Sequence, residues 1–214
     1  MSVHQFIELS FSAYEKALGI VKCTRPCVVK PGFPILWFGD LDVFLAGDEK
    51  ERSVSVGVNP SAQELKCDKT GHFVRFPNLV AFDGSIDYDQ YREAMNDYFK
   101  KKEYKWFSKG MGPLYTSYKD GRLIHIDCCS SIATRPSWSG LCKNVKDYLR
   151  DINRPIFEDF LRFLNPTTVY IASNKEEFSY IKKVCKKVLG LPESSYISIY
   201  KYKSRAKEDS KTIE

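Results

Sequence analysis

The sequence lacks long apolar segments and any recognisable export signal. No run approaches the roughly 18 uninterrupted apolar residues that a membrane-spanning helix requires, so we expect no membrane association. The first 18 residues include Glu8 and Glu15 and do not show the basic and then apolar pattern of a secretory signal. Both absences favour a cytoplasmic protein.

Cysteine and histidine are present in numbers and spacings that exclude several kinds of site. The seven cysteines are scattered and odd in number, which argues against a disulfide framework and for a reducing compartment. A closed zinc or iron–sulfur site needs four convergent ligands, and the three histidines complete no zinc-finger spacing. We expect free thiols, no metal and no cofactor. The absence of a Gly-x-Gly-x-x-Gly or phosphate-loop motif also argues against an unrelated nucleotide-binding α/β protein.

The remaining composition is that of a globular protein. The chain has 214 residues, 43% of them hydrophobic and 28% charged, which excludes a largely disordered chain. This length predicts a single domain over residues 1–214, with a polar tail over 203–214, and we expect a monomer. The formal net charge of +6 permits a nucleic-acid partner without demonstrating one.

Hydrophobic periodicity predicts alternating helices and strands. Helices are predicted over 4–22, 87–108, 145–164 and 175–189, the last closed by Gly190. Strands are predicted over 53–58, 122–126, 167–172 and 195–202, and a strand or hairpin over 34–38 and 43–45. This alternation predicts an α/β fold in which a mostly parallel sheet is covered on both faces. Ligands of such sheets bind at the carboxyl ends of the strands.

The most informative segment is Gly57-Val-Asn-Pro-Ser61, at the end of a predicted strand. Gly57 allows a ligand or another backbone to approach closely. Asn59 presents an amide oxygen and an amide nitrogen, and Pro60 fixes the turn that aims them. Such an Asn can orient a water molecule without being a strong base. Taken alone, an Asn-Pro segment after a strand is more often only a turn, and that interpretation stays open.

Trp37-Phe-Gly39, followed by Val54 to Ser61, resembles the first motif of the uracil-DNA glycosylase superfamily, whose mismatch-specific branch has Gly-Ile-Asn-Pro-Gly here. Residues 122–127 and 167–175 are similar to the two core strands that follow in that family, and the resemblance covers roughly 34–204. It implies a three-layer α/β/α fold with a central, mostly parallel sheet of about four strands. It also implies hydrolysis of the N-glycosidic bond of a base flipped out of DNA, which leaves an abasic site.

The resemblance implies roles for individual residues. Asn59 corresponds to the residue that positions the attacking water, and Gly57 lies beside the base. Phe73 and Phe76 are candidates for the ring that stacks on the flipped base, with an ordinary core position as the alternative. Asp127 stands where uracil-specific members have Asn. An ionised Asp only accepts hydrogen bonds, which suits the exocyclic amine of cytosine better than a uracil carbonyl. The alternative is that Asp127 caps a turn or pairs with a basic residue.

The candidate DNA contacts are Ser61, Arg135 and Ser137, whose side chains suit phosphates. The family's second motif, a His-Pro-Ser or similar segment after the last strand, has no His here. Ser204 is a candidate for its phosphate-binding Ser, and Lys203 or Arg205 for its His, although a plain basic tail is equally consistent. The sequence thus predicts a monofunctional glycosylase for a damaged or modified pyrimidine, with cytosine-type bases favoured, in DNA repair or in phage defence. The alternative is a catalytically weak, nucleic-acid-binding relative.

Overall fold

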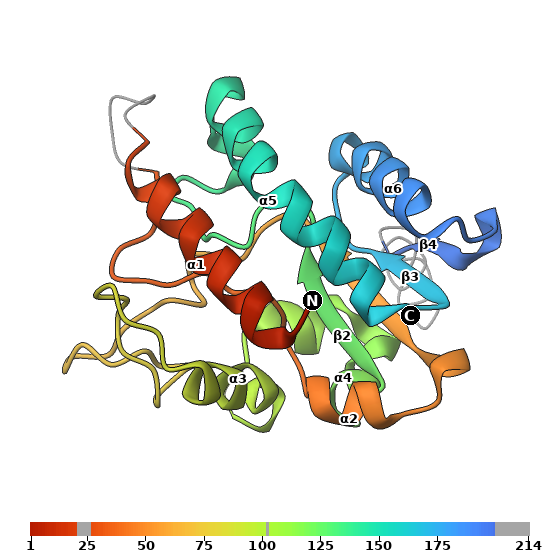
Figure 1. Ribbon diagram of the computed structural model, residues 1–214, viewed down its shortest axis with the longest axis horizontal. Coiled ribbons are helices and arrows are strands. Elements are labelled where there is room, and N and C mark those ends of the chain that lie inside the picture. The colour runs from red at the N-terminus through yellow and green to blue at the C-terminus, as the bar shows by residue number, and fades with distance from the viewer. Residues whose placement is uncertain (21–26, 102, 200–214) are drawn as a thin grey trace, which may run out of the picture.

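A computed structural model describes residues 1–20, 27–101 and 103–199 (Figure 1). Its described part contains a four-stranded sheet with the strand order β2-β1-β3-β4, in which all neighbouring strands are parallel. This confirms the predicted parallel α/β sheet. The strands are β1 (Ser53–Gly57), β2 (Leu123–Asp127), β3 (Thr168–Ile171) and β4 (Tyr196–Ser198).

Helices cover both faces of the sheet and complete three layers (Figure 1). The longest helix, α5, crosses in front of β2, whereas α4 lies behind it. Helix α1 packs against α5, which packs against α6. The α-helices are α1 (Val3–Leu18), α2 (Leu41–Ala46), α3 (Tyr88–Asn96), α4 (Tyr115–Lys119), α5 (Lys143–Leu164) and α6 (Lys175–Leu189).

Local sequence signals account for the elements that were predicted with accurate bounds. Val54, Val56, Ile124 and Ile126 are buried on the paired strands β1 and β2, as expected of parallel strands covered on both faces. Helix α6 begins after Asn174, whose side chain accepts a hydrogen bond from Glu177 N, and ends at a left-handed Gly190. Strong caps at both ends therefore fix this helix.

Two predicted elements differ from the structure. No strand hairpin forms over 34–45: Phe38 makes only an isolated bridge to His125, and residues 41–46 form α2. The Asp40 side chain caps this short helix by accepting from Val43 N, and the cap overrides the strand propensity of the apolar residues. The helix predicted over 87–108 ends at Asn96, and beyond it the Tyr98 hydroxyl accepts a hydrogen bond from Tyr104 N.

Other predictions are confirmed in part. Helix α5 continues through Pro155 as a single helix. Strand β4 covers only the first part of the range 195–202, and residues 200–214 lie outside the described part of the chain. None of the helices described is long and apolar enough to cross a membrane.

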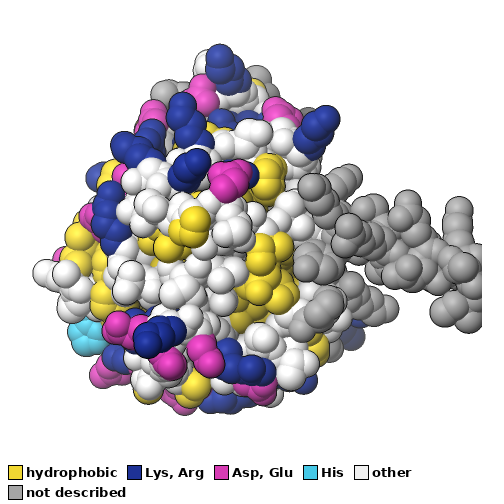
Figure 2. All heavy atoms as spheres, turned by 90° about the vertical axis from the view of Figure 1, so that its right-hand side faces the viewer, with side chains coloured by type: hydrophobic (Ala, Val, Ile, Leu, Met, Phe, Trp, Pro, Cys, Tyr) yellow, Lys and Arg dark blue, Asp and Glu magenta, His cyan; other side chains and the backbone are white. Residues whose placement is uncertain are grey.

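Helix α6 carries a run of basic residues, Lys182, Lys183, Lys186 and Lys187, whose charge is partly neutralised. Lys182 and Lys186 both form ion pairs with Glu193. Figure 2 shows acidic side chains lying among the basic ones on this side of the molecule. The run therefore has the character of a solvated, mixed-charge surface, and it adds little to a nucleic-acid interface.

Candidate functional site: a polar pocket beside a cationic groove

A pocket of about 210 Å³ opens at the carboxyl ends of β1 and β2. Pockets for drug-sized ligands begin at about 300 Å³, so this one suits a single small ring. The pocket brings together the predicted residues Gly57, Asn59, Ser61 and Asp127. It is lined by Phe38, Gly57, Val58, Asn59, Pro60, Ser61, Glu64, Tyr104, Trp106, Phe107, His125, Asp127 and Ala172.

The strand register places the polar groups of the pocket. Ser55 is paired with His125, and Gly57 is paired with Asp127. Residues two apart on a strand share a face, so all four positions lie on one side of the sheet. A Cβ atom on Gly57 would collide with Asp127 Oδ1 and would lie 2.9 Å from His125 Nε2. Glycine is therefore required here because two side-chain tips occupy the space above it.

The side-chain amide of Asn59 is held in one orientation. Its Nδ2 atom donates to Thr134 Oγ1 at 3.2 Å, to Pro60 O at 3.2 Å and, at 3.4 Å, to Ile132 O. Within the described residues no donor engages Oδ1, so this oxygen remains an acceptor at the pocket. The arrangement is suited to holding a water molecule.

Asp127 is a buried carboxylate with an unfilled hydrogen-bonding capacity. Its side chain is 3% exposed, and Oδ1 lies 3.6 Å from His125 Nε2. No hydrogen bond from another described residue reaches the carboxylate, so it caps no turn in that part of the chain. Its nearest basic partner is His125, which also lines the pocket.

His125 is the end of a buried hydrogen-bond chain. Tyr118 donates to Ser55 Oγ at 2.6 Å, and Ser55 Oγ lies 2.7 Å from His125 Nδ1. Three aromatic rings also contact the imidazole, with centroid distances of 5.6 Å from Phe38, 5.3 Å from Trp106 and 5.1 Å from Phe107. Packing and hydrogen bonding together hold the ring in a fixed orientation.

Glu64 adds a second buried carboxyl group to the pocket wall. Burial is the largest influence on this group and raises its pKa to about 7, although the Tyr98 hydroxyl, at 2.7 Å from Oε2, and Arg75 both act to lower it. Asp127 also raises the pKa, because two nearby carboxylates repel each other. The pocket therefore contains a carboxyl group that changes charge near neutral pH.

The two predicted stacking residues do not line this pocket. Phe73 and Phe76 are each 1% exposed and pack edge-on against Phe33, with centroid distances of 5.0 and 5.2 Å. They occupy the core position that was their alternative. The rings at the pocket are Phe38, Tyr104, Trp106 and Phe107, of which Tyr104 and Trp106 are half-buried. These two are therefore the stacking candidates that the structure offers.

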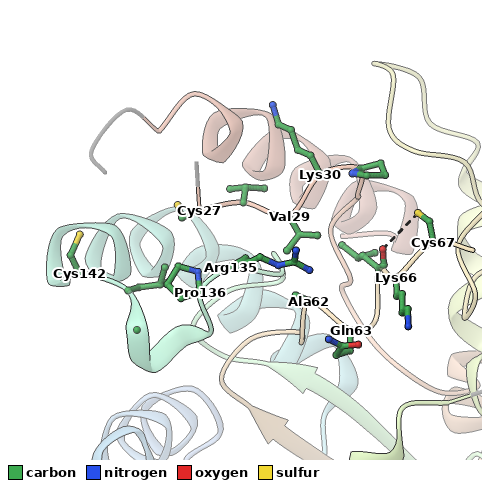
Figure 3. A pocket seen from close by; sticks show the side chains of 15 residues that line it. Cys27, Val29, Lys30, Ala62, Gln63, Lys66, Cys67, Arg135, Pro136 and Cys142 are labelled. Atoms are coloured by element: carbon green, nitrogen blue, oxygen red, sulfur yellow. Dashed lines mark hydrogen bonds between the residues drawn. The ribbon is translucent and has the colours of Figure 1, made fainter. Parts of the chain in front are cut away.

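A larger groove of about 1160 Å³ lies beside the pocket. Ala62 and Gln63 line the groove while Ser61 and Glu64 line the pocket, so one short segment borders both. The exposed Lys30, Lys66 and Arg135 belong to three segments that line the groove (Figure 3). None of the residues described as lining it is acidic, and these cations have no carboxylate partner among the described residues. The groove is suited to an anionic ligand.

The other predicted DNA contacts have different positions. Ser137 is exposed and lines neither the pocket nor the groove. Its hydroxyl oxygen lies 3.3 Å from that of Ser139. Lys203, Ser204 and Arg205 lie outside the described residues. The loop that presents Arg135 is anchored by Trp138, whose Nε1 donates to Glu177 at 2.9 Å. Trp138 is also buried, so it anchors the loop by packing as well as by this hydrogen bond.

Several residues that line the pocket were not predicted from the sequence. His125 was not among the predicted site residues, although it lies two residues before the predicted Asp127, a spacing that places both on the same face of a strand. Glu64 and Trp106 belong to irregular segments and have no local sequence signal. Within the part of the chain that is described, no group of three or more His, Cys, Asp or Glu side chains could hold a metal ion.

Comparisons with known proteins do not identify a family for this chain. No protein-family model, curated protein or solved structure matches the chain. The relation to the uracil-DNA glycosylase superfamily therefore stays a hypothesis based on the motifs.

Proposed function

We propose that the protein is a monofunctional DNA glycosylase that hydrolyses the N-glycosidic bond of a flipped-out pyrimidine, with a cytosine-type base favoured. The observation that supports this most is the position of the Asn59 amide. Its nitrogen is engaged by the loop over 132–134, and its oxygen remains an acceptor in a pocket of single-ring size. A base stacked in a duplex hides its sugar bond, so such a pocket requires the base to be flipped out.

The pocket suits a reaction in which water is the nucleophile. Asn59 Oδ1 accepts a hydrogen bond from the water and orients it. An amide oxygen is a weak base, so it does not deprotonate the water. The bond from C1′ to the base breaks largely first, and its electron pair leaves with the base. The water oxygen then bonds to the oxocarbenium-like C1′. The proton that the water loses balances the one that the departing base gains, which leaves an abasic sugar and a free base.

The cationic groove supports DNA as the substrate. Phosphates are recognised mainly by charge and by hydrogen-bond donors, which position the duplex without specifying its sequence. Arg135 follows Thr134, whose hydroxyl accepts a hydrogen bond from the Asn59 amide, so the residue that would bind a phosphate is the chain neighbour of one that holds the proposed water-binding amide. The protein is expected to act as a cytoplasmic monomer without a cofactor.

Abasic-site formation is the assay that tests the proposal. Oligonucleotides containing uracil, mismatched thymine, cytosine, 5-hydroxymethylcytosine or glucosylated hydroxymethylcytosine are incubated with the protein, and alkali-labile breaks are scored. We expect breaks at a cytosine-type base. Asn59→Ala should abolish them while most DNA binding remains, and Asn144→Ala, at an exposed position of α5, should behave as the parent does.

The same assay separates the alternative function. A catalytically weak nucleic-acid-binding relative would bind DNA but give no abasic site as either the parent or the Asn59→Ala variant. Circular dichroism of each variant confirms that a loss of activity is not a loss of folding. If none of the five bases is released by a folded parent protein, the glycosylase proposal is wrong.

A further inference from the structure

The buried chain Tyr118–Ser55–His125 determines which nitrogen of His125 holds the ring proton. Tyr118 donates to Ser55 Oγ, so the Ser55 proton must be directed elsewhere. Ser55 is fully buried, and His125 Nδ1 at 2.7 Å is the sole further partner of its hydroxyl among the residues described. Because a buried donor without an acceptor is costly, Ser55 donates and Nδ1 accepts. The proton of a neutral imidazole then lies on Nε2.

The same geometry places that N–H beside Asp127. His125 Nε2 lies 3.6 Å from Asp127 Oδ1, and both atoms lie close to the position that a Gly57 side chain would occupy. Both residues line the pocket. A hydrogen-bond donor and an acceptor therefore stand side by side at the bottom of a cavity of single-ring size.

We propose that His125 and Asp127 act as a pair that recognises the edge of an amino-pyrimidine. Asp127 accepts from the 4-amino group, and His125 Nε2–H donates to N3. Cytosine and its 5-substituted derivatives present this adjacent amino donor and ring-nitrogen acceptor. This inference rests on the proposed function and extends it by adding a second specificity residue, with Ser55 and Tyr118 as positioning residues.

Uracil and thymine present the opposite arrangement on the same edge. In the same binding register, the Asp127 carboxylate would face the O4 carbonyl, and the His125 N–H would face N3–H. Two acceptors and two donors would then oppose each other, and each pair would lose a hydrogen bond in a buried site. A bidentate contact of this kind discriminates between bases by about 1–3 kcal/mol, which corresponds to roughly 5- to 150-fold.

Binding to uncleavable analogues tests the donor. The probes are oligonucleotides with a 2′-fluoroarabino sugar at one position, bearing cytosine, 3-deazacytosine or uracil; 3-deazacytosine replaces the N3 acceptor with C–H. The parent should bind cytosine about 10-fold more tightly than 3-deazacytosine. His125→Leu should bind the two alike, at the weaker level. Equal discrimination by the parent and by His125→Leu would overturn the proposal, as would a parent preference for uracil.

Nitrogen NMR of the His125 ring tests the positioning residues without relying on activity. The parent should show a proton on Nε2 and none on Nδ1. Ser55→Ala should remove this bias and lower the discrimination between cytosine and 3-deazacytosine. Ser10→Ala is the matched control, since Ser10 is equally buried and its side chain hydrogen-bonds, among the residues described, within α1, to Ile7 O at 2.7 Å. A ring proton on Nδ1 in the parent would overturn the assignment.

The outcomes for this pair and for the glycosylase proposal are distinguishable. Abasic sites at a cytosine-type base, together with a ring proton on Nδ1 or unchanged discrimination in His125→Leu, would reject the pair and retain the glycosylase. An Nε2 proton without abasic sites from any base would reject the glycosylase, and with it a substrate role for the pair.

Discussion

Glu64 gives the sharpest physical test of the pocket, because its environment makes protein stability depend on pH. The side chain is 2% exposed, and burial raises its pKa from the ordinary 4.5 to about 7. The charged and titratable groups that act on it are Arg75, Tyr98 and Asp127. Replacing Glu64 with Gln removes the titration while keeping an oxygen that can accept from Tyr98.

The direction of the effect follows from proton linkage. Below pH 4.5 the carboxyl group is protonated in both the folded and the unfolded chain, and its full contribution to stability is present. Between pH 4.5 and about 7 the unfolded chain releases the proton while the folded chain retains it, so the free energy of unfolding falls. The pKa difference corresponds to a fall of about 3 kcal/mol, complete near pH 7.

Urea unfolding at a series of pH values measures this quantity. The free energy of unfolding of the parent minus that of Glu64→Gln should fall by about 3 kcal/mol from pH 4.5 to pH 7.5 and then level off. Taking the difference removes the titrations that both proteins share. Glu93→Gln, which loses an exposed carboxylate on α3, controls for the loss of a charge. A difference that is flat, or that rises with pH, would refute the reasoning about burial.

Three further predictions concern the pocket and the groove. Gly57→Ala should lower the free energy of unfolding by about 1–3 kcal/mol, measured by urea denaturation, and should abolish abasic-site formation, because the new methyl group collides with Asp127. Asp127→Asn should shift the preference from cytosine toward uracil in a competition assay, and an unchanged preference would contradict its proposed role. Arg135→Ala should weaken binding to all DNA sequences alike and reduce the slope of log K against log salt by about 1. Arg162→Ala, at a residue that pairs with Glu158 and Asp159 on α5, should leave that slope unchanged.

The fold was predictable wherever a local signal and tertiary burial agree. Helix α6 was predicted to the residue because Asn174 and Gly190 cap a periodic segment. The strand or hairpin predicted over 34–45 was wrong. Val43 and Phe44 favour a strand locally, whereas the Asp40 cap and burial of Phe44 favour a helix. Short segments of this kind contain too few residues for hydrophobic periodicity to distinguish a strand from a helix.

The candidate site was predictable only where it follows a strand. Asn59 and Asp127 were found because residues after parallel strands meet at one edge of a sheet. The aromatic rings that line the pocket were not predicted, because the choice of Phe73 and Phe76 relied on distance along the chain from Asn59. Tyr104 and Trp106 reach the pocket through the irregular segment that follows α3, and no pattern in the sequence specifies its path.

The cost of the polar network argues for a functional role rather than a structural one. Ser55, His125 and Asp127 occupy buried positions between apolar neighbours on the adjacent strands β1 and β2, where Val or Ile would pack without desolvating a polar group. A network that served only stability would satisfy every member, because each unfilled group is expensive in a low-dielectric interior. Here the chain is satisfied from Tyr118 to His125 Nδ1 and ends, within the described residues, in a carboxylate that receives no hydrogen bond. The unfilled end lies at the pocket, which is the arrangement expected if a ligand completes the network.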